Sequence, residues 1–218
     1  ACAGGGGRVN YGLLPFFDEY WTSDDTDAFQ RLFIQWGTSH FYPAIGMGSH
    51  VSATPNHQTG RVTPLKFRFD VAMQGRLGME LQPKNMNDKE KEFAKRAIAA
   101  YKDVRHVVQM GDLYRLNSPF DGDYVTSLMY SSEDKSKAVF YVYRDHKVCT
   151  IQNDPLIRLD GVDENKNYKF TDITPLDPNR PHWLSGKVIS GRALKKAGIR
   201  VNLDGDFSSA VFKLEAVN

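Results

Sequence analysis

The sequence predicts an α/β portion followed by an all-β portion, and the change falls near Gly111. Before that glycine, short apolar segments alternate with segments of helical period, which is the order of a parallel sheet or barrel. After it, short β-branched and aromatic segments are separated by polar turns, which is typical of an antiparallel sandwich. A closed eight-stranded barrel needs about 250 residues. We therefore expect a piece of a (β/α)8 barrel over residues 1–111 and an antiparallel β-sandwich over residues 112–218.

The composition excludes several classes of partner. The 218 residues carry a formal charge of +2 with acidic and basic residues mixed throughout, so nucleic acid and anionic membranes are not expected as partners. No apolar run approaches the ~18 residues of a membrane span, and no signal-peptide pattern is present. Cys2 and Cys149 fall in different predicted portions and indicate neither a disulfide nor a zinc site. Cytoplasmic and periplasmic or secreted locations both stay open.

The first predicted strand ends over Tyr20-Trp21-Thr22-Ser23, and Asp24 and Asp25 follow it. Thr26 and Asp27 can cap the helix that comes next, although Asp24 or Asp25 could be that cap instead. A carboxylate at the C-terminal end of a barrel strand, beside an aromatic wall, is a common place for sugar chemistry.

Four consecutive glycines, Gly4 to Gly7, lie between Cys2 and Arg8. Because glycine has no Cβ, the backbone of this run can approach a ligand closely. A flexible turn is the alternative interpretation of the same run.

Helical periodicity predicts three helices in the first portion, each followed by a glycine that should end it. They span Thr26 to Thr38 with Gly37 as the stop, Pro64 to Met73 before Gly75, and Asn87 or Asp88 to Met110 before Gly111. Strands are expected to end near His50 and to cover residues 77–81. In the second portion strands are expected at residues 112–116, 124–130, 138–143, 155–159, 167–172, 199–203 and 209–214, with a short helix within 186–197. Without a low-complexity linker, the two portions should share a tight interface.

Six motifs in chain order resemble the C-terminal half of bacterial α-galactosidases of glycoside hydrolase family 36. They are CAGGGGR (residues 2–8), WTSDDTD (21–27), QWGT (35–38), GSHVS (48–52), PNHQT (55–59) and GRLGMEL (75–81). The match is colinear from Ala1 to about Asp145 and continues more loosely beyond it. The resemblance implies the fifth to eighth units of the catalytic barrel, followed by the family's C-terminal sandwich.

The resemblance also implies an activity and a set of site residues. Such enzymes are retaining glycosidases that remove terminal α-linked galactose from oligosaccharides such as raffinose or melibiose, without a cofactor or metal. Asp24 matches the acid/base, whose task calls for a pKa raised toward the working pH. Cys2 and Gly5 match galactose contacts through sulfur and a backbone amide, and Trp21 matches the sugar-facing wall. Arg8 could bind a ring hydroxyl or could be structural.

Two departures from the family pattern matter. Asn10 stands where many members carry Asp. The asparagine keeps the shape of that side chain but removes a negative charge near Arg8. The family nucleophile lies in a Lys-Trp-Asp motif, and no such motif occurs in these 218 residues. We therefore expect a C-terminal fragment of a larger enzyme that is not competent alone. The resemblance implies that the parent enzyme is a homo-oligomer, such as a tetramer.

Two alternatives to this interpretation stay open. Within the family, the activity could be that of an α-N-acetylgalactosaminidase. From another class, the chain could be a non-catalytic module that binds carbohydrate or mediates assembly, which exposed aromatic residues on the sandwich would favour. The candidates are Tyr114, Tyr124, Tyr143 and Trp183, all of which could equally be core. His50 and His57 lack a third metal ligand and are expected in loops, with His50 near the pocket.

Overall fold

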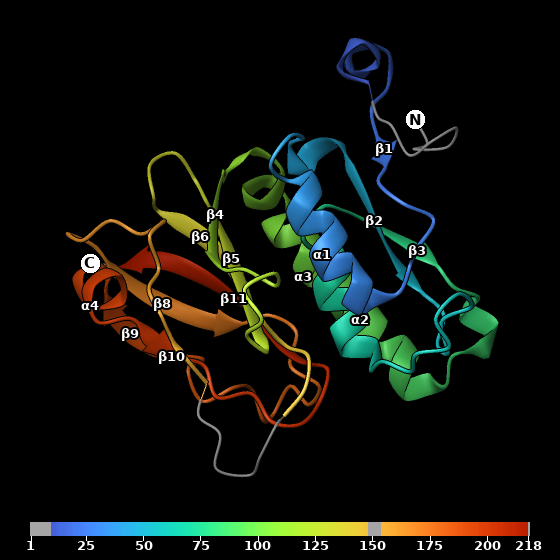
Figure 1. Ribbon diagram of the computed structural model, residues 1–218. Coiled ribbons are helices and arrows are strands. Elements are labelled where there is room, and N and C mark those ends of the chain that lie inside the picture. The colour runs from blue at the N-terminus through green and yellow to red at the C-terminus, as the bar shows by residue number, and fades with distance from the viewer. Residues whose placement is uncertain (1–9, 148–153, 218) are drawn as a thin grey trace.

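The protein is described by a computed structural model that covers residues 10–147 and 154–217 (Figure 1). Three helices lie between a three-stranded parallel sheet and a six-stranded antiparallel sheet (Figure 1). The change from the parallel to the antiparallel part follows the third helix.

The parallel part alternates strands with helices. Its strands pair in the order β1-β2-β3, with β2 in the middle. The elements are β1 (Tyr20–Trp21), α1 (Ala28–Thr38), β2 (Met47–Ser52), α2 (Leu65–Ala72), β3 (Arg76–Glu80) and α3 (Asp88–Met110), with short 3-10 helices η1 (Tyr11–Phe16), η2 (Ala44–Gly46) and η3 (Pro83–Asn85).

The helix starts follow the predicted capping chemistry. Asp27 is the N-cap of α1, and its carboxylate accepts from the backbone N–H of Phe29 at 2.9 Å. Asn87 caps α3 in a reciprocal capping box with Glu90, at 3.0 and 2.9 Å. Pro64 precedes α2 as its N-cap and is not the first helical residue.

The predicted glycine stops are only partly correct. Helix α1 ends at Thr38 as predicted, so Gly37 is its last residue but one, and a Cβ there would meet nothing within 4 Å. Helix α2 ends at Ala72, ahead of Gly75. Gly111 does end α3, at a φ of −82° that any residue can adopt. Close packing explains this glycine, since a Cβ there would lie 2.5 Å from the carbonyl oxygen of Val107 and 2.6 Å from that of Ser131.

The antiparallel part is built on one large sheet of order β4-β5-β6-β11-β8-β9, together with a two-stranded pair of β7 and β10. Strand β9 was not predicted, because its three residues are too few to show an alternation. The elements are β4 (Asp112–Asn117), β5 (Val125–Ser131), β6 (Lys137–Arg144), β7 (Leu156–Ile157), β8 (Asn167–Asp172), β9 (Val188–Ser190), α4 (Gly191–Lys196), β10 (Ile199–Arg200) and β11 (Ser208–Val217).

The two parts share a core. One face of the large sheet packs with β7, β10 and α4, and its other face packs on the three helices of the parallel part. Three tyrosine hydroxyls cross this interface to backbone carbonyls of α2 and the two residues after it. Tyr143 donates to Asp70 at 2.7 Å, and Tyr141 and Tyr130 donate to Met73 and Gln74, both at 2.9 Å. The expected tight interface is present.

Burial decides most of the aromatic candidates for glycan binding. Tyr143 is completely buried, so the expectation that it could form a surface platform is wrong. Tyr114 and Tyr124 are partly buried against the sheet core. Trp183 is 54% exposed. Within residues 10–147 and 154–217, no helix combines the length and the apolar character that crossing a membrane requires.

Candidate functional site

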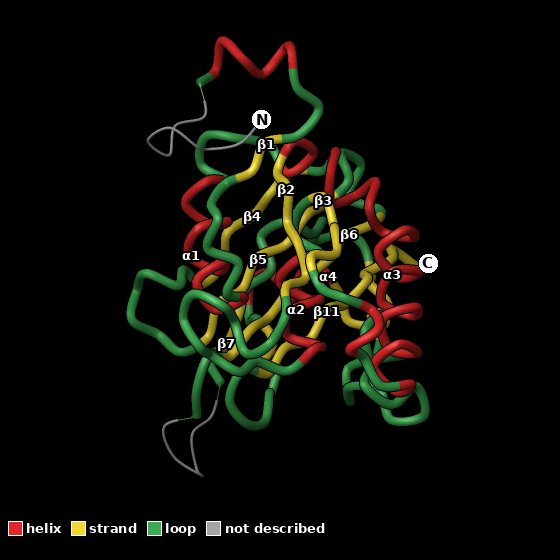
Figure 2. The backbone as a smooth tube through the Cα atoms, turned by 90° about the vertical axis from the view of Figure 1, so that its right-hand side faces the viewer, coloured by secondary structure: helices red, strands yellow, loops and turns green. Residues whose placement is uncertain are grey.

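The parallel sheet has one face toward the helices and one open face, onto which Figure 2 looks. Ser49 faces the helices and contacts Gln35 of α1, and Val51 and Leu77 pack in the helix-side core. Because strand residues alternate between faces, their neighbours point the other way. Pairing aligns Trp21 with Gly48, Gly48 with Arg76, and His50 with Gly78. The open face is therefore lined by polar, aromatic and glycine residues.

Asp24 lies three residues after the end of β1, at the C-terminal end of the sheet. Its side chain is exposed, and Oδ1 accepts a hydrogen bond from the indole Nε1 of Trp21 at 3.0 Å. The cap of α1 is Asp27, and Asp25 holds that residue by accepting its backbone N–H at 3.0 Å. Neither Asp24 nor Asp25 is the helix cap, so the expectation that one of them could cap α1 is wrong.

Trp21 is held by two further side chains. The guanidinium carbon of Arg31 lies 4.4 Å from the centre of the indole, and the His50 ring lies 4.5 Å from it at an interplanar angle of 45°. Arg31 is itself buried, with Nη2 donating to the Ser23 carbonyl at 2.9 Å and Nη1 contacting the Thr22 hydroxyl. Burial lowers the pKa of Arg31 to about 10, which leaves it charged at neutral pH.

A chain of charged groups extends from this cluster across the sheet. Nε2 of His50 lies 3.8 Å from Oε1 of Glu19, and Oε2 of Glu19 lies 3.2 Å from Nε of Arg76. Arg76 also donates from Nη1 to the carbonyl of Asp18 at 2.9 Å. The segment that leads into β1 is thereby attached to both β2 and β3.

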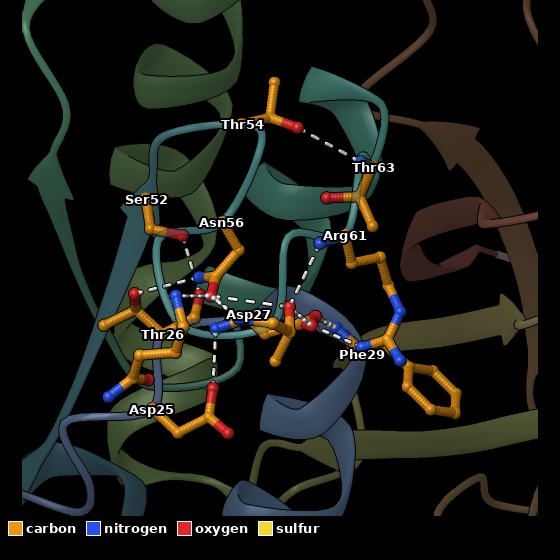
Figure 3. Close-up of polar contacts among 11 residues, drawn as sticks. Asp25, Thr26, Asp27, Phe29, Ser52, Thr54, Asn56, Arg61 and Thr63 are labelled. Atoms are coloured by element: carbon orange, nitrogen blue, oxygen red, sulfur yellow. Dashed lines mark hydrogen bonds and ion pairs between the residues drawn. The ribbon is translucent and has the colours of Figure 1, made fainter.

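Asp27 connects the loop after β1 to the loop after β2 (Figure 3). Although its side chain is only 1% exposed, its carboxylate accepts from the Thr59 hydroxyl at 2.5 Å and forms an ion pair with Arg61. The Arg61 guanidinium lies 4.7 Å from the centre of the Phe29 ring. A buried carboxylate with a charge partner and several donors is the arrangement that keeps such a group ionised inside a protein.

Thr26 makes the second connection between the same loops (Figure 3). Its carbonyl accepts from the Ser52 hydroxyl at 2.6 Å, and its hydroxyl accepts from Nδ2 of Asn56 at 3.3 Å. Ser52 ends β2, so the segment that carries Asp24 is fixed directly to the neighbouring strand.

Three of the predicted sugar contacts, Cys2, Gly5 and Arg8, lie outside the described residues. Asn10 caps η1, with its side-chain oxygen accepting from the Gly12 N–H at 2.9 Å. An aspartate could accept the same bond, so Asn in place of Asp leaves this cap intact.

The two candidate histidines occupy different environments. His50 lies within β2, which corrects the expectation of a loop position, and His57 is exposed in the loop after β2. The part of the chain that the structure describes holds no group of three or more potential metal ligands from histidine, cysteine, aspartate and glutamate.

Sequence reasoning brought Trp21 and Asp24 together but missed the residues around them. Glu19, Arg31 and Arg76 were not selected, because their contacts depend on strand register and on how α1 sits over the loop. One usable signal was the spacing of Gly48 and His50. Two residues of a strand that are two positions apart lie on the same face, so this pair could have indicated the face that carries the cluster.

The geometry permits proton transfer at the C-terminal edge of the sheet. An exposed carboxyl group, oriented by an indole N–H, can in its protonated form give a proton to a ligand on the open face and, as the resulting carboxylate, take one back. The aromatic rings beside it offer an apolar surface of the kind on which a sugar ring can pack.

Comparisons with known proteins match both parts of the chain. Residues 1–111 match the family model described as melibiase, and residues 125–214 match that of the glycosyl hydrolase family 36 C-terminal domain. The chain is 42% identical to the α-galactosidase AgaA of Geobacillus stearothermophilus over 100% of its length and 28% of that enzyme. It is 39% identical to α-galactosidase 2 of Hypocrea jecorina, covering 98% of the chain and 27% of the relative.

Solved structures give the same result. AgaB of G. stearothermophilus superposes with a TM-score of 0.88 at 41% identity, over 99% of this chain and 28% of that protein. A variant of AgaA in complex with raffinose gives the same TM-score, identity and coverage. The chain thus spans little more than a quarter of the relatives it matches.

Proposed function

The chain belongs to the melibiase family, and from that premise we propose that it is the acid/base-bearing part of a retaining α-galactosidase. The observation that carries the proposal is the carboxylate of Asp24. It stands exposed at the C-terminal end of a parallel strand and accepts the indole N–H of Trp21. Catalytic groups of barrel enzymes occupy this end of the strands.

We propose that β1, β2 and β3 are consecutive strands in the second half of a (β/α)8 barrel. In support, they are parallel, they are adjacent in chain order, and the helices that connect them cover one face of the sheet. The boundary between barrel and β-domain then falls at residue 111, between the ranges 1–111 and 112–218. Helix α3 ends at Met110 and β4 begins at Asp112.

In the proposed reaction Asp24 acts twice. It first protonates the departing glycosidic oxygen, while a second carboxylate attacks the anomeric carbon and forms a glycosyl-enzyme. It then removes a proton from the water that hydrolyses this intermediate. The hydrogen bond from Trp21 to Oδ1 fixes how the carboxyl group of Asp24 is oriented toward the ligand.

The second carboxylate must come from residues that this sequence does not contain. Retaining enzymes hold their two carboxyl groups about 5–5.5 Å apart, and the family's Lys-Trp-Asp nucleophile motif is missing from the 218 residues. The 218-residue chain alone is therefore inactive. We use "complete enzyme" for the polypeptide that joins these residues to the missing nucleophile.

The substrates proposed are oligosaccharides with terminal α-linked galactose. One homologous structure holds raffinose and another holds stachyose, both of which fit this class. We propose Cys2, Gly5, Arg8 and Trp21 as the residues that contact galactose. We also propose that the complete enzyme is a homo-oligomer.

The test compares the isolated chain with the complete enzyme on an aryl α-galactoside. Turnover should be absent from the isolated chain and present in the complete enzyme. The Asp24→Asn change should lower that turnover by about 10²–10⁴-fold, the range expected of general acid–base catalysis. Turnover by the isolated chain would refute the missing-nucleophile proposal, and an unaffected Asp24→Asn enzyme would refute the role of Asp24.

A further inference from the structure

We propose that His50 is a positioning residue for Asp24, which it holds in place through Trp21. The inference rests on the proposed acid/base role of Asp24. His50 lies on the strand next to β1 and would fix the orientation of the Asp24 carboxyl group.

The first observation is a continuous path of contacts. The His50 ring lies 4.5 Å from the Trp21 ring, and the Trp21 Nε1 donates to Oδ1 of Asp24 at 3.0 Å. Since Asp24 is exposed, the indole N–H sets its direction more than packing does. A ring that moves the indole therefore moves the carboxylate.

The second observation is that glycines make room for both rings on the open face. A Cβ at Gly48 would lie 3.2 Å from Cε3 of Trp21 and 2.5 Å from Oε1 of Glu19. A Cβ at Gly78 would lie 2.2 Å from Cδ2 of His50, a distance that no side-chain carbon can occupy. The His50 ring consequently occupies the space that a Cβ at Gly78 would need, so a glycine is required there.

The third observation is that the far edge of the His50 ring is also held. Its Nε2 lies 3.8 Å from Oε1 of Glu19, which is in turn paired with Arg76 of β3. The ring is confined by Trp21 and Glu19, which belong to or adjoin β1, and by Gly78 of β3, the strand on the other side of β2. This confinement distinguishes a positioning role from a chance surface contact.

The experiment measures kcat/KM of the complete enzyme on two substrates. Raffinose has a poor leaving group that needs protonation, whereas 4-nitrophenyl α-galactoside has a good one that needs little. If the carboxyl group of Asp24 is misoriented, kcat/KM on raffinose should fall about 10- to 100-fold. The kcat/KM on 4-nitrophenyl α-galactoside should fall less than about 3-fold. The ratio of the two values does not depend on how much of a preparation is folded, so it remains informative for an unstable variant.

Four variants separate the possibilities. His50→Ala and Gly78→Ala should both show the selective loss, the second because the new methyl group displaces the ring. His50→Phe keeps a ring and should restore the ratio. Gly37→Ala is the matched control, because a Cβ at Gly37 meets nothing within 4 Å, and its ratio should equal that of the unchanged enzyme.

The outcomes are decisive in both directions. An equal loss on both substrates, or no loss, in His50→Ala would overturn the inference, as would a His50→Phe ratio no better than that of His50→Ala. Asp24→Asn is measured alongside. If it leaves both substrates unaffected, the proposed function itself is wrong. If it lowers raffinose turnover while the His50 and Gly78 variants do not, only the positioning role is wrong.

Discussion

Removal of the Asp27 side chain should destabilise the protein measurably, because this one carboxylate has three separate partners. Asp27→Ala loses the N-cap of α1, which is worth about 1 kcal/mol. It also loses charge-assisted bonds from Thr59 and Arg61, worth about 1.5–3 kcal/mol in such settings. Arg61 is partly exposed and can regain water, so the lower end applies to it. The expected total is about 3 kcal/mol.

Asp27→Asn divides this total into its parts. Asparagine caps helices as well as aspartate does, so this variant should lose only the charge-dependent portion, about 1–2 kcal/mol. For a protein of this size each kcal/mol lowers Tm by about 2–4 °C. Thermal unfolding followed by circular dichroism should therefore show falls of about 6–12 °C for Asp27→Ala and about 2–8 °C for Asp27→Asn.

Asp88→Ala is the matched control, since Asp88 is fully exposed in the first turn of α3. Its weak pairing with Lys91 is worth about 0.5 kcal/mol, so its Tm should fall by no more than about 2 °C. The reasoning would be refuted if Asp27→Ala melted no lower than this control. Equal falls for the two Asp27 variants would show instead that the cap contributes nothing.

Four further substitutions test buried groups and helix ends. Burial raises the pKa of Asp70 above its usual value, so the folded state binds this proton more tightly than the unfolded state does. The unfolding free energy should consequently fall as pH rises from about 4 through the raised pKa, and Asp70→Asn should flatten that slope in urea titrations. Tyr143→Phe leaves a buried carbonyl of Asp70 without its donor and should cost about 1–3 kcal/mol in the same titration; a neutral result would contradict the interface described. Gly37→Ala should stabilise α1 by about 0.5–1 kcal/mol. Gly111→Ala should destabilise the protein, because its Cβ would meet two carbonyl oxygens. If the unfolding free energy changed in the same direction in both variants, this reasoning would be wrong.

Local chemistry explains what the sequence could predict. The capping residues Asp27 and Asn87 act within a few residues of themselves, so their roles are readable from spacing alone. The strand–helix alternation and the pairing of Trp21 with Asp24 within one short motif are local in the same sense. These features needed no knowledge of tertiary packing.

The features that sequence reasoning missed all depend on contacts between distant segments. Tyr143 was considered a surface aromatic because strand alternation does not say which face a second layer covers. The place of His50 against Gly78 follows from the register of β2 with β3, which no single strand specifies.

The most direct test of the central claim is the product that azide forms with the Asp24→Asn complete enzyme acting on 4-nitrophenyl α-galactoside. If Asp24 is the acid/base, its loss slows hydrolysis of the glycosyl-enzyme, and azide can replace water without needing a general base. Azide should then accelerate turnover and give α-galactosyl azide, with the configuration of the substrate retained. A β-galactosyl azide product would identify Asp24 as the nucleophile and would contradict the account, as would a variant that azide does not affect and that turns over like the unchanged enzyme.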